Sequence, residues 1–251
     1  MISGFNVELS KNSISAWEKY HQKGLEMYSD LKRNISSNIE DMIFNDKIDG
    51  DSLQNLWFPT DLFKNDKYIF ISHSHQDKEL AINLAGYLHA KLGVKSFIDS
   101  CVWGNIVDLN RQLNDCTLGN EDYCKRCDCQ QFSQNLAYVH MMLSSALMTA
   151  INKCSYVFFL NTPSSININK KTESPWIYYE LNIVNIISAN RKTQIAKRKG
   201  VYNRTLSESV EFTANIKDMP KLTYKDLWGW EIDYYLSDEK VNPIDLLQKY
   251  C

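Results

Sequence analysis

The stretch "KYIFISHSHQDKELAINLAGYLHAKLGVKSFID" (residues 67–99) decides the fold, because it has the pattern of a strand, a helix and a second strand. Residues 67–72 form a continuous apolar run, which is typical of a parallel strand covered on both faces. Residues 77–93 place leucines on one face of a helix, and Gly93 is the predicted stop. Residues 94–99 predict the second strand, so the stretch indicates a right-handed βαβ unit.

The alternation continues along the chain. Residues 132–152 predict a long amphipathic helix, 155–161 a third buried strand, and 174–190 another helix. Alternating strands and helices predict an α/β class with a flavodoxin-like open parallel sheet and helices on both faces. Beyond about residue 195 the pattern is weaker, with a candidate strand at 210–216 and a short helix at 243–251.

The N-terminal part has a different pattern. Residues 14–43 carry apolar side chains at spacings of mostly three or four, which indicates a helical stripe. An Asp-Gly turn follows within residues 45–52. We therefore predict a helical N-terminal extension over 1–62. An α/β domain over 63–251 follows, with a Cys-rich insertion near 105–131 and a divergent C-terminal part.

Composition limits the functional classes. The hydrophobic share of 44% and the charged share of 23% are ordinary for a globular protein. A net charge of -2 gives no general attraction to nucleic acid or to an anionic membrane. No apolar stretch has the roughly 18 residues that span a bilayer. Seven cysteines without an export signal suit a reducing compartment, so we expect a cytoplasmic protein with no nucleic acid or membrane partner.

Candidate site residues follow the predicted strands. In open parallel sheets, ligands bind at the carboxyl ends of the strands. Ser72, His73 and Ser74 follow the first strand, and they either hydrogen-bond ribose or phosphate or act as turn and capping residues. Glu180 lies about two turns into the helix that begins with "SPWIYYEL" (174–181), so we expect it to face the same edge.

Four motifs in order resemble a bacterial Toll/interleukin-1 receptor (TIR) domain. "YIFISHSHQDKELA" is similar to the first strand and loop of the family, and "FIDSCVWG" stands where its second strand and following loop would be. "LMTAINKCSYVFFLNTPSS" resembles its helix, strand and loop, and "SPWIYYEL" matches its Ser-x-Trp-x-x-x-Glu helix. The resemblance covers about residues 66–190.

The resemblance implies an enzyme that cleaves NAD+ at the nicotinamide–ribose bond, as an NAD+ glycohydrolase or ADP-ribosyl cyclase. NAD+ would be the substrate, and no other cofactor is implied. The family's essential glutamate falls on Glu180, and an aromatic pocket residue falls on Trp176, one turn earlier. Asp99 and Trp103 fall in the loop after the second strand, although "SCVWGN" lacks the basic and Pro-Gly elements that are usual there.

Bacterial relatives of this kind often act in antiphage defence, as in Thoeris-like systems. The resemblance therefore implies an ADP-ribose-derived nucleotide signal that a separate effector protein senses, or depletion of NAD+ itself. It also implies self-association through the loop after the second strand.

Two other functions stay open at the level of sequence. The first is a non-catalytic TIR scaffold that joins partner proteins. The second is a flavodoxin-like enzyme that transfers glycosyl groups of nucleosides, because such enzymes also use a glutamate. Glu180 and Trp176 favour an enzyme over a scaffold, since a scaffold requires neither.

A cysteine cluster leaves a further choice. "CTLGNEDYCKRCDC" contains Cys116, Cys124, Cys127 and Cys129. Four thiols within fourteen residues can hold a structural zinc ion, but no second well-spaced Cys-x-x-Cys pair follows. The alternative is a set of reduced thiols in the insertion, and we expect no metal.

Overall fold

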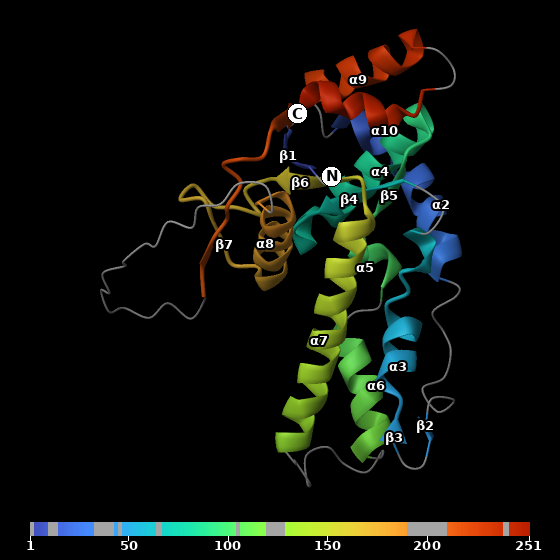
Figure 1. The fold of residues 1–251 in the computed structure, drawn as a ribbon, viewed down its shortest axis with the longest axis vertical. Coiled ribbons are helices and arrows are strands. Elements are labelled where there is room, and N and C mark those ends of the chain that lie inside the picture. The colour runs from blue at the N-terminus through green and yellow to red at the C-terminus, as the bar shows by residue number, and fades with distance from the viewer. Residues whose placement is uncertain are drawn as a thin grey trace.

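The structure is a computed structural model that describes residues 3–9, 15–32, 43–44, 47–63, 67–103, 106–118, 129–189, 210–237 and 241–251. A five-stranded sheet with the order β5-β4-β6-β1-β9 forms its centre, and every neighbouring pair in it is parallel. Its strands are β1 (Ser3–Glu8), β4 (Tyr68–Ser72), β5 (Lys95–Phe97), β6 (Tyr156–Asn161) and β9 (Lys221–Thr223). This sheet and its flanking helices confirm the predicted α/β, flavodoxin-like class (Figure 1).

The elements predicted between residues 67 and 190 are confirmed to within a few residues. The main helices of this part are α4 (Lys78–Leu92), α7 (Cys129–Lys153) and α8 (Pro175–Ala189). All five residues of β4 are buried, as expected of an unbroken apolar strand with helices on both sides. Gly93 ends α4 in the left-handed region, with φ of 64°, which is the conformation that favours glycine at a helix C-terminus.

The prediction of a purely helical N-terminal extension is wrong for the first residues. Ser3–Glu8 form β1, which lies inside the sheet between β6 and β9. Phe5 and Val7 alternate with polar residues and are fully buried, and β1 pairs with β6 in a register that sets Ser3 opposite Tyr156. Because β1 fills the position between β6 and β9, the N-terminal segment belongs to the α/β domain and is not an appendage.

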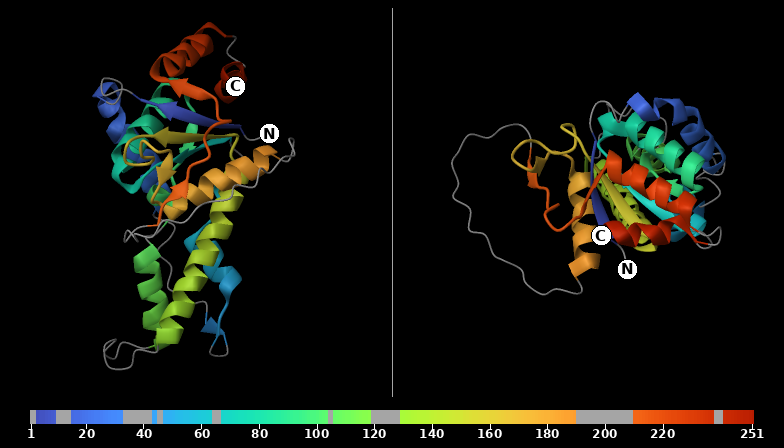
Figure 2. Two further views of the ribbon diagram at one scale, coloured as in Figure 1. Left: turned by 90° about the vertical axis from the view of Figure 1, so that its left-hand side faces the viewer. Right: turned by 90° about the horizontal axis from the view of Figure 1, so that it is seen from above.

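The helices lie on both faces of the sheet. In Figure 2, α2 (His21–Lys32), α4 and α9 (Tyr224–Leu236) lie on one side of the strands, and α8 lies on the other. Helix α4 connects β4 to its neighbour β5. Helix α7 precedes β6, which lies on the other side of β4 in the sheet. A right-handed connection places α7 on the opposite face from α4, so the topological switch point lies between β4 and β6.

Two glycines let α2 and α4 approach closely. A Cβ added at Gly86 would lie 2.1 Å from the Tyr20 carbonyl oxygen, and one added at Gly24 would lie 2.2 Å from the Ile82 carbonyl oxygen. Both obstacles are backbone atoms, which cannot move without displacing a helix. Glycine at these two positions therefore sets the distance between the helices.

A helical arm extends away from the sheet (Figure 1). Its elements are α3 (Gly50–Trp57), α6 (Ile106–Leu118), the first half of α7, and the hairpin of β2 (Ile43–Phe44) and β3 (Lys47–Ile48). Asn135 Nδ2 donates to Asn114 Oδ1 at 2.8 Å, and this buried bond joins α7 to α6. The predicted Cys-rich insertion thus includes a helix packed on α7.

The remaining elements are short. They are η1 (Glu18–Tyr20), η3 (Asp61–Phe63), η4 (His75–Asp77), α5 (Asp99–Val102), β7 (Lys171–Thr172), β8 (Phe212–Thr213), α10 (Pro243–Leu246) and η5 (Leu247–Tyr250). The candidate strand at 210–216 is reduced to β8, which pairs with β7 outside the main sheet. The helix predicted at 243–251 is confirmed as α10 followed by η5. Among the described residues, no helix has both the length and the apolar character that crossing a membrane requires.

Candidate active site

Ser72 and Glu180 meet at the carboxyl edge of the sheet. Ser72 is the last residue of β4, and Glu180 lies in the second turn of α8, which begins with Pro175 after β6 and its loop. The Ser72 hydroxyl donates a hydrogen bond to Glu180 Oε2. Both side chains are buried, at 1% and 4% exposure. The structure therefore places Glu180 at the predicted edge, beside the switch point, and not toward bulk solvent.

The surroundings of Glu180 favour its uncharged form. Burial raises the pKa of Glu180 well above its usual range, and the nearby Asp99 carboxylate raises this pKa further. The hydrogen bond from Ser72 acts in the opposite direction, because it stabilises the carboxylate. A strongly raised pKa is unusual for a glutamate, and such perturbed groups gather at functional sites.

His73 and the segment after β5 lie beside this pair. His73 Nδ1 lies 3.3 Å from the Ile71 carbonyl oxygen, and its Nε2 lies 3.1 Å from Ser100 Oγ. Since a carbonyl oxygen only accepts, Nδ1 carries the proton and Nε2 accepts from the Ser100 hydroxyl. Burial lowers the pKa of His73, although the Asp99 carboxylate opposes this effect. His73 is thus a neutral imidazole whose Nε2 can accept a proton.

Asp99 opens α5 directly after β5, and its side chain is half-buried. Its charge acts on both Glu180 and His73, so the three groups are close enough to interact. We call Ser72, His73, Asp99 and Glu180 the carboxyl-edge cluster. All four were candidate site residues: Ser72 and His73 because they follow the first strand, Glu180 because its helix begins at the same edge, and Asp99 through the family resemblance.

Ser74 has a different role from that of its neighbours. Its hydroxyl donates to Asp77 Oδ2 at 2.6 Å, and the Thr162 hydroxyl donates to the same oxygen at 2.5 Å. Asp77 therefore joins the loop after β4 to the loop after β6. Ser74 is buried at 6% exposure, so in this conformation its hydroxyl holds the two loops together.

The two candidate tryptophans differ in environment. Trp103 is only 4% exposed, and its ring makes edge contacts with Phe97 at 5.0 Å and Phe58 at 5.5 Å between centroids. Trp103 lies after β5 as predicted, directly following α5, and in this conformation it lies in the hydrophobic core. Its indole N–H is buried and has no hydrogen-bond partner among the described residues, so the aromatic contacts alone stabilise this position.

Trp176 remains near the candidate site. It is half-buried and precedes Glu180 by one helical turn on α8. Its ring stacks on the imidazole of His140 from α7, with centroids 5.4 Å apart and planes 16° apart. Sequence reasoning did not identify His140, because its proximity to Trp176 depends on how α7 and α8 pack.

The side chains of the cysteine cluster lie outside the described part of the chain. Cys124 and Cys127 lie outside the described residues, and so do the side chains of Cys116 and Cys129. Within the part of the chain that the structure describes, no group of three or more His, Cys, Asp or Glu side chains has a metal-binding arrangement. Two described cysteines, Cys101 and Cys154, are buried and are not part of a disulfide bond.

Comparisons of the chain with protein-family models, with curated proteins and with solved structures find no match. The support for a function therefore comes from the geometry of the carboxyl-edge cluster and from the motifs of this chain. In the present conformation Ser72 and Glu180 are closed to solvent, so a substrate reaches them only when covering side chains move.

Proposed function

We propose that the protein is a TIR-like enzyme that cleaves the nicotinamide–ribose bond of NAD+, with Glu180 as the catalytic carboxyl group. The observation that supports this most directly is the buried Ser72–Glu180 pair at the switch point of a parallel sheet. Ligands of open α/β sheets bind at that place, and a carboxyl group with a raised pKa is uncommon in a purely structural role.

The reaction requires a negative charge at Glu180 once the substrate is bound. Nicotinamide leaves from a cationic ring, and the ribose carbon gains oxocarbenium character in the transition state. A cation beside Glu180 lowers its pKa, so substrate binding favours loss of the proton that burial retains. The resulting carboxylate stabilises the developing positive charge, an effect worth roughly 3–4 kcal/mol for comparable electrostatic groups.

Neighbouring groups have roles that fit this reaction. The neutral Nε2 of His73 is a proton acceptor for a ribose hydroxyl or an attacking water. Ser72 holds the Glu180 carboxyl in position through its hydroxyl. Trp176 lies one turn before Glu180 on α8 and stacks on His140, so a flat substrate ring would stack on its other face or displace the imidazole.

The product and its use extend the same proposal. Release of free ADP-ribose, a cyclic isomer or a conjugate each follows from the same bond cleavage. A nucleotide signal in bacterial antiphage defence, sensed by a separate effector in the cytoplasm, is the use that we propose, with depletion of NAD+ as the other outcome. Self-association through the loop after β5 belongs to this proposal, although Cys101, Val102 and Trp103 in that loop are buried.

The test compares three proteins with NAD+ as substrate. Wild type, Glu180→Gln and Glu173→Gln are each added to lysate from phage-infected cells, and nicotinamide and nucleotide products are identified by mass spectrometry. Glu173 is an exposed carboxylate just before α8, so Glu173→Gln is the matched control. We expect Glu180→Gln to release nicotinamide about a hundredfold more slowly than wild type, or not at all, and Glu173→Gln to match wild type. Equal release from all three proteins would exclude Glu180 from the mechanism.

A non-catalytic scaffold is the second candidate, and one feature of α9 favours it. Tyr224, Trp228, Ile232 and Leu236 follow one another at four-residue spacing and are 38%, 57%, 36% and 81% exposed. Such an apolar stripe on a helix is typical of a surface that packs on another protein. A scaffold predicts that Trp228→Ser abolishes an assembly seen by analytical ultracentrifugation, and that no activated condition gives NAD+ turnover.

A further inference from the structure

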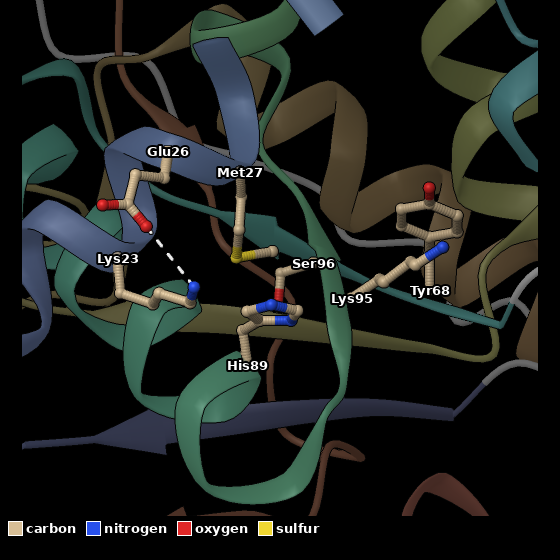
Figure 3. Close-up of a pocket in the computed structure, with 7 residues that line it drawn as sticks. All are labelled: Lys23, Glu26, Met27, Tyr68, His89, Lys95 and Ser96. Atoms are coloured by element: carbon tan, nitrogen blue, oxygen red, sulfur yellow. Dashed lines mark hydrogen bonds and ion pairs between the residues drawn. The ribbon is translucent and has the colours of Figure 1, made fainter. Parts of the chain in front are cut away.

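A cavity of about 390 Å³ lies at the amino edge of the sheet, at the opposite ends of the strands from Glu180. It is lined by α2, by the last turns of α4 and by the first residues of β4 and β5, and it opens to solvent on one side (Figure 3). Met27 and Tyr68 give it apolar walls, while Lys23, His89 and Ser96 supply polar groups. We call this cavity the amino-edge pocket.

Two buried polar atoms in the amino-edge pocket have no partner within the described part of the chain. They are Ser96 Oγ and His89 Nδ1. Ser96 is only 1% exposed, and its backbone carbonyl already accepts from Tyr28 Oη at 3.1 Å. A buried polar group without a hydrogen-bond partner destabilises a protein by about 1–3 kcal/mol. Two such groups in one cavity therefore indicate a bound molecule that forms hydrogen bonds with both.

The charges around the pocket are positive in sum. Lys23 and Lys95 each contribute a positive charge, and Glu26 contributes one negative charge. Glu26 is exposed and pairs with Lys23 at the rim, with 3.4 Å between Oε2 and Nζ. Burial lowers the pKa of His89, and Lys23 and Lys95 lower it further. With a neutral His89, one net positive charge remains.

The geometry points to a binding site for a small phosphate monoester in the amino-edge pocket, with the phosphate between Ser96, His89 and the lysines. The Ser96 hydroxyl and an imidazole N–H donate to two phosphate oxygens, and an ammonium group donates to a third. Donors from three different elements suit the several oxygens of a phosphate better than the two oxygens of a carboxylate.

The size of the pocket specifies the rest of the ligand. A volume of about 390 Å³ falls in the range of small-molecule sites and exceeds what a bare phosphate fills. Met27 and the Tyr68 ring offer apolar contact to a short organic group. This site is independent of NAD+ cleavage, because it lies at the other edge of the sheet and shares no residue with the carboxyl-edge cluster.

Thermal unfolding with three probes tests the site. The full chain is heated with glycerol 3-phosphate, with inorganic phosphate, or with glycerol, which lacks the phosphate. We expect saturable stabilisation by glycerol 3-phosphate, a smaller effect of inorganic phosphate, and none of glycerol. Equal stabilisation by inorganic phosphate and by glycerol 3-phosphate would overturn the proposal of a monoester site, because the pocket would then bind the free anion.

Two variants locate the effect. Ser96→Ala and His89→Gln are expected to weaken the response to glycerol 3-phosphate about tenfold or more, because each removes a ligand contact made by a buried polar atom. The control Lys249→Gln removes a lysine that pairs with Asp233 on α9, and it should respond as wild type does. Two-dimensional NMR is the second readout, and we expect shifts of the Ser96 amide and the His89 ring with the same saturation.

Two results would contradict the proposal. If Ser96→Ala retains the full response, the phosphate binds elsewhere. If wild type shows no saturable response in either measurement, Ser96 Oγ and His89 Nδ1 are satisfied by water alone and the pocket is not a phosphate site.

Discussion

Ser72 and Ser96 make the clearest comparison between the two edges of the sheet. They lie on the neighbouring strands β4 and β5, and each is 1% exposed. Ser72 Oγ donates to Glu180, a side chain that the fold brings from α8, whereas Ser96 Oγ has no partner among the described residues. Two serine hydroxyls of equal burial therefore differ in their partners. At the carboxyl edge the chain itself supplies the hydrogen-bond partner, and at the amino edge a ligand can supply it.

The largest expected effect comes from Gly86→Ala, which acts on the packing of α4 against η1 and α2, the helix that lines the amino-edge pocket with it. The new Cβ would meet the Tyr20 carbonyl oxygen at 2.1 Å, so α2 must move away from α4. We expect a loss of about 3 kcal/mol in the free energy of unfolding, measured by urea denaturation, and loss of the response to glycerol 3-phosphate. The control is Gly50→Ala, where no atom lies within 4 Å of the added Cβ. Equal stability of the two variants would show that the α2–α4 crossing adapts.

Ser72→Ala and Ser96→Ala test the comparison directly. Ser72→Ala removes the hydroxyl that donates to the buried Glu180 carboxyl, so we expect the free energy of unfolding to fall by about 1–3 kcal/mol. Ser96→Ala removes a hydroxyl for which the described residues supply no partner, so without ligand it should leave stability unchanged or raise it by up to about 1 kcal/mol. Urea denaturation of both variants in phosphate-free buffer gives the result. Similar destabilisation by both would mean that Ser96 has a structural partner.

Glu180 should make stability depend on pH. An unfolded glutamate has a pKa of about 4.3, while burial raises the folded pKa well above that value. Between these two pKa values the unfolded chain has released the proton and the folded protein retains it. Stability is therefore complete below the unfolded pKa and falls as pH rises toward the folded pKa, by at most about 1.4 kcal/mol per pH unit.

Glu180→Gln should remove this pH dependence. The amide cannot ionise, so the variant should be as stable as wild type in acid and more stable at neutral or alkaline pH. Melting temperatures across the pH range, with Glu173→Gln as the exposed control, measure the difference. Parallel curves for wild type and Glu180→Gln would show that Glu180 is ionised in the folded protein.

The smallest expected effect is at the rim of the amino-edge pocket. Glu26→Gln removes the negative charge that lines the pocket and leaves the two lysines. Because Glu26 is exposed, we expect only a two- to fivefold tighter response to glycerol 3-phosphate, or about 0.4–1 kcal/mol. Weaker binding by Glu26→Gln would mean that Glu26 holds Lys23 in place for the ligand.

Local patterns predicted most elements of the sheet well. Unbroken apolar runs predict β4 and β6, because a strand that is buried on both faces is apolar throughout. Helical spacing predicts α4 and α8, because a helix that packs on a sheet buries one stripe of its surface. The edge on which Glu180 lies is also predictable, because the helix that follows a parallel strand begins at that edge.

Among the elements that escaped prediction, β1 and α9 are two for which the sequence carries a signal. Phe5 and Val7 alternate with polar residues, which is a strand pattern. Thr223 and Asp226 form a capping box at the start of α9, and their three-residue spacing is a recognised signature of a helix N-terminus. The position of β1 in the sheet could not be predicted, because this strand pairs with β6, about 150 residues away.

The sequence by itself determined the α/β class, the order of the elements between residues 67 and 190, and the candidacy of Glu180. These features depend on residues close together in the chain, whose spacing reports burial directly. Only the tertiary structure decided that Ser72 bonds Glu180, that Trp103 lies in the core, and that Ser96 and His89 share a pocket with Lys23. Such contacts join distant segments through packing, and no local pattern specifies which buried polar atom finds a partner.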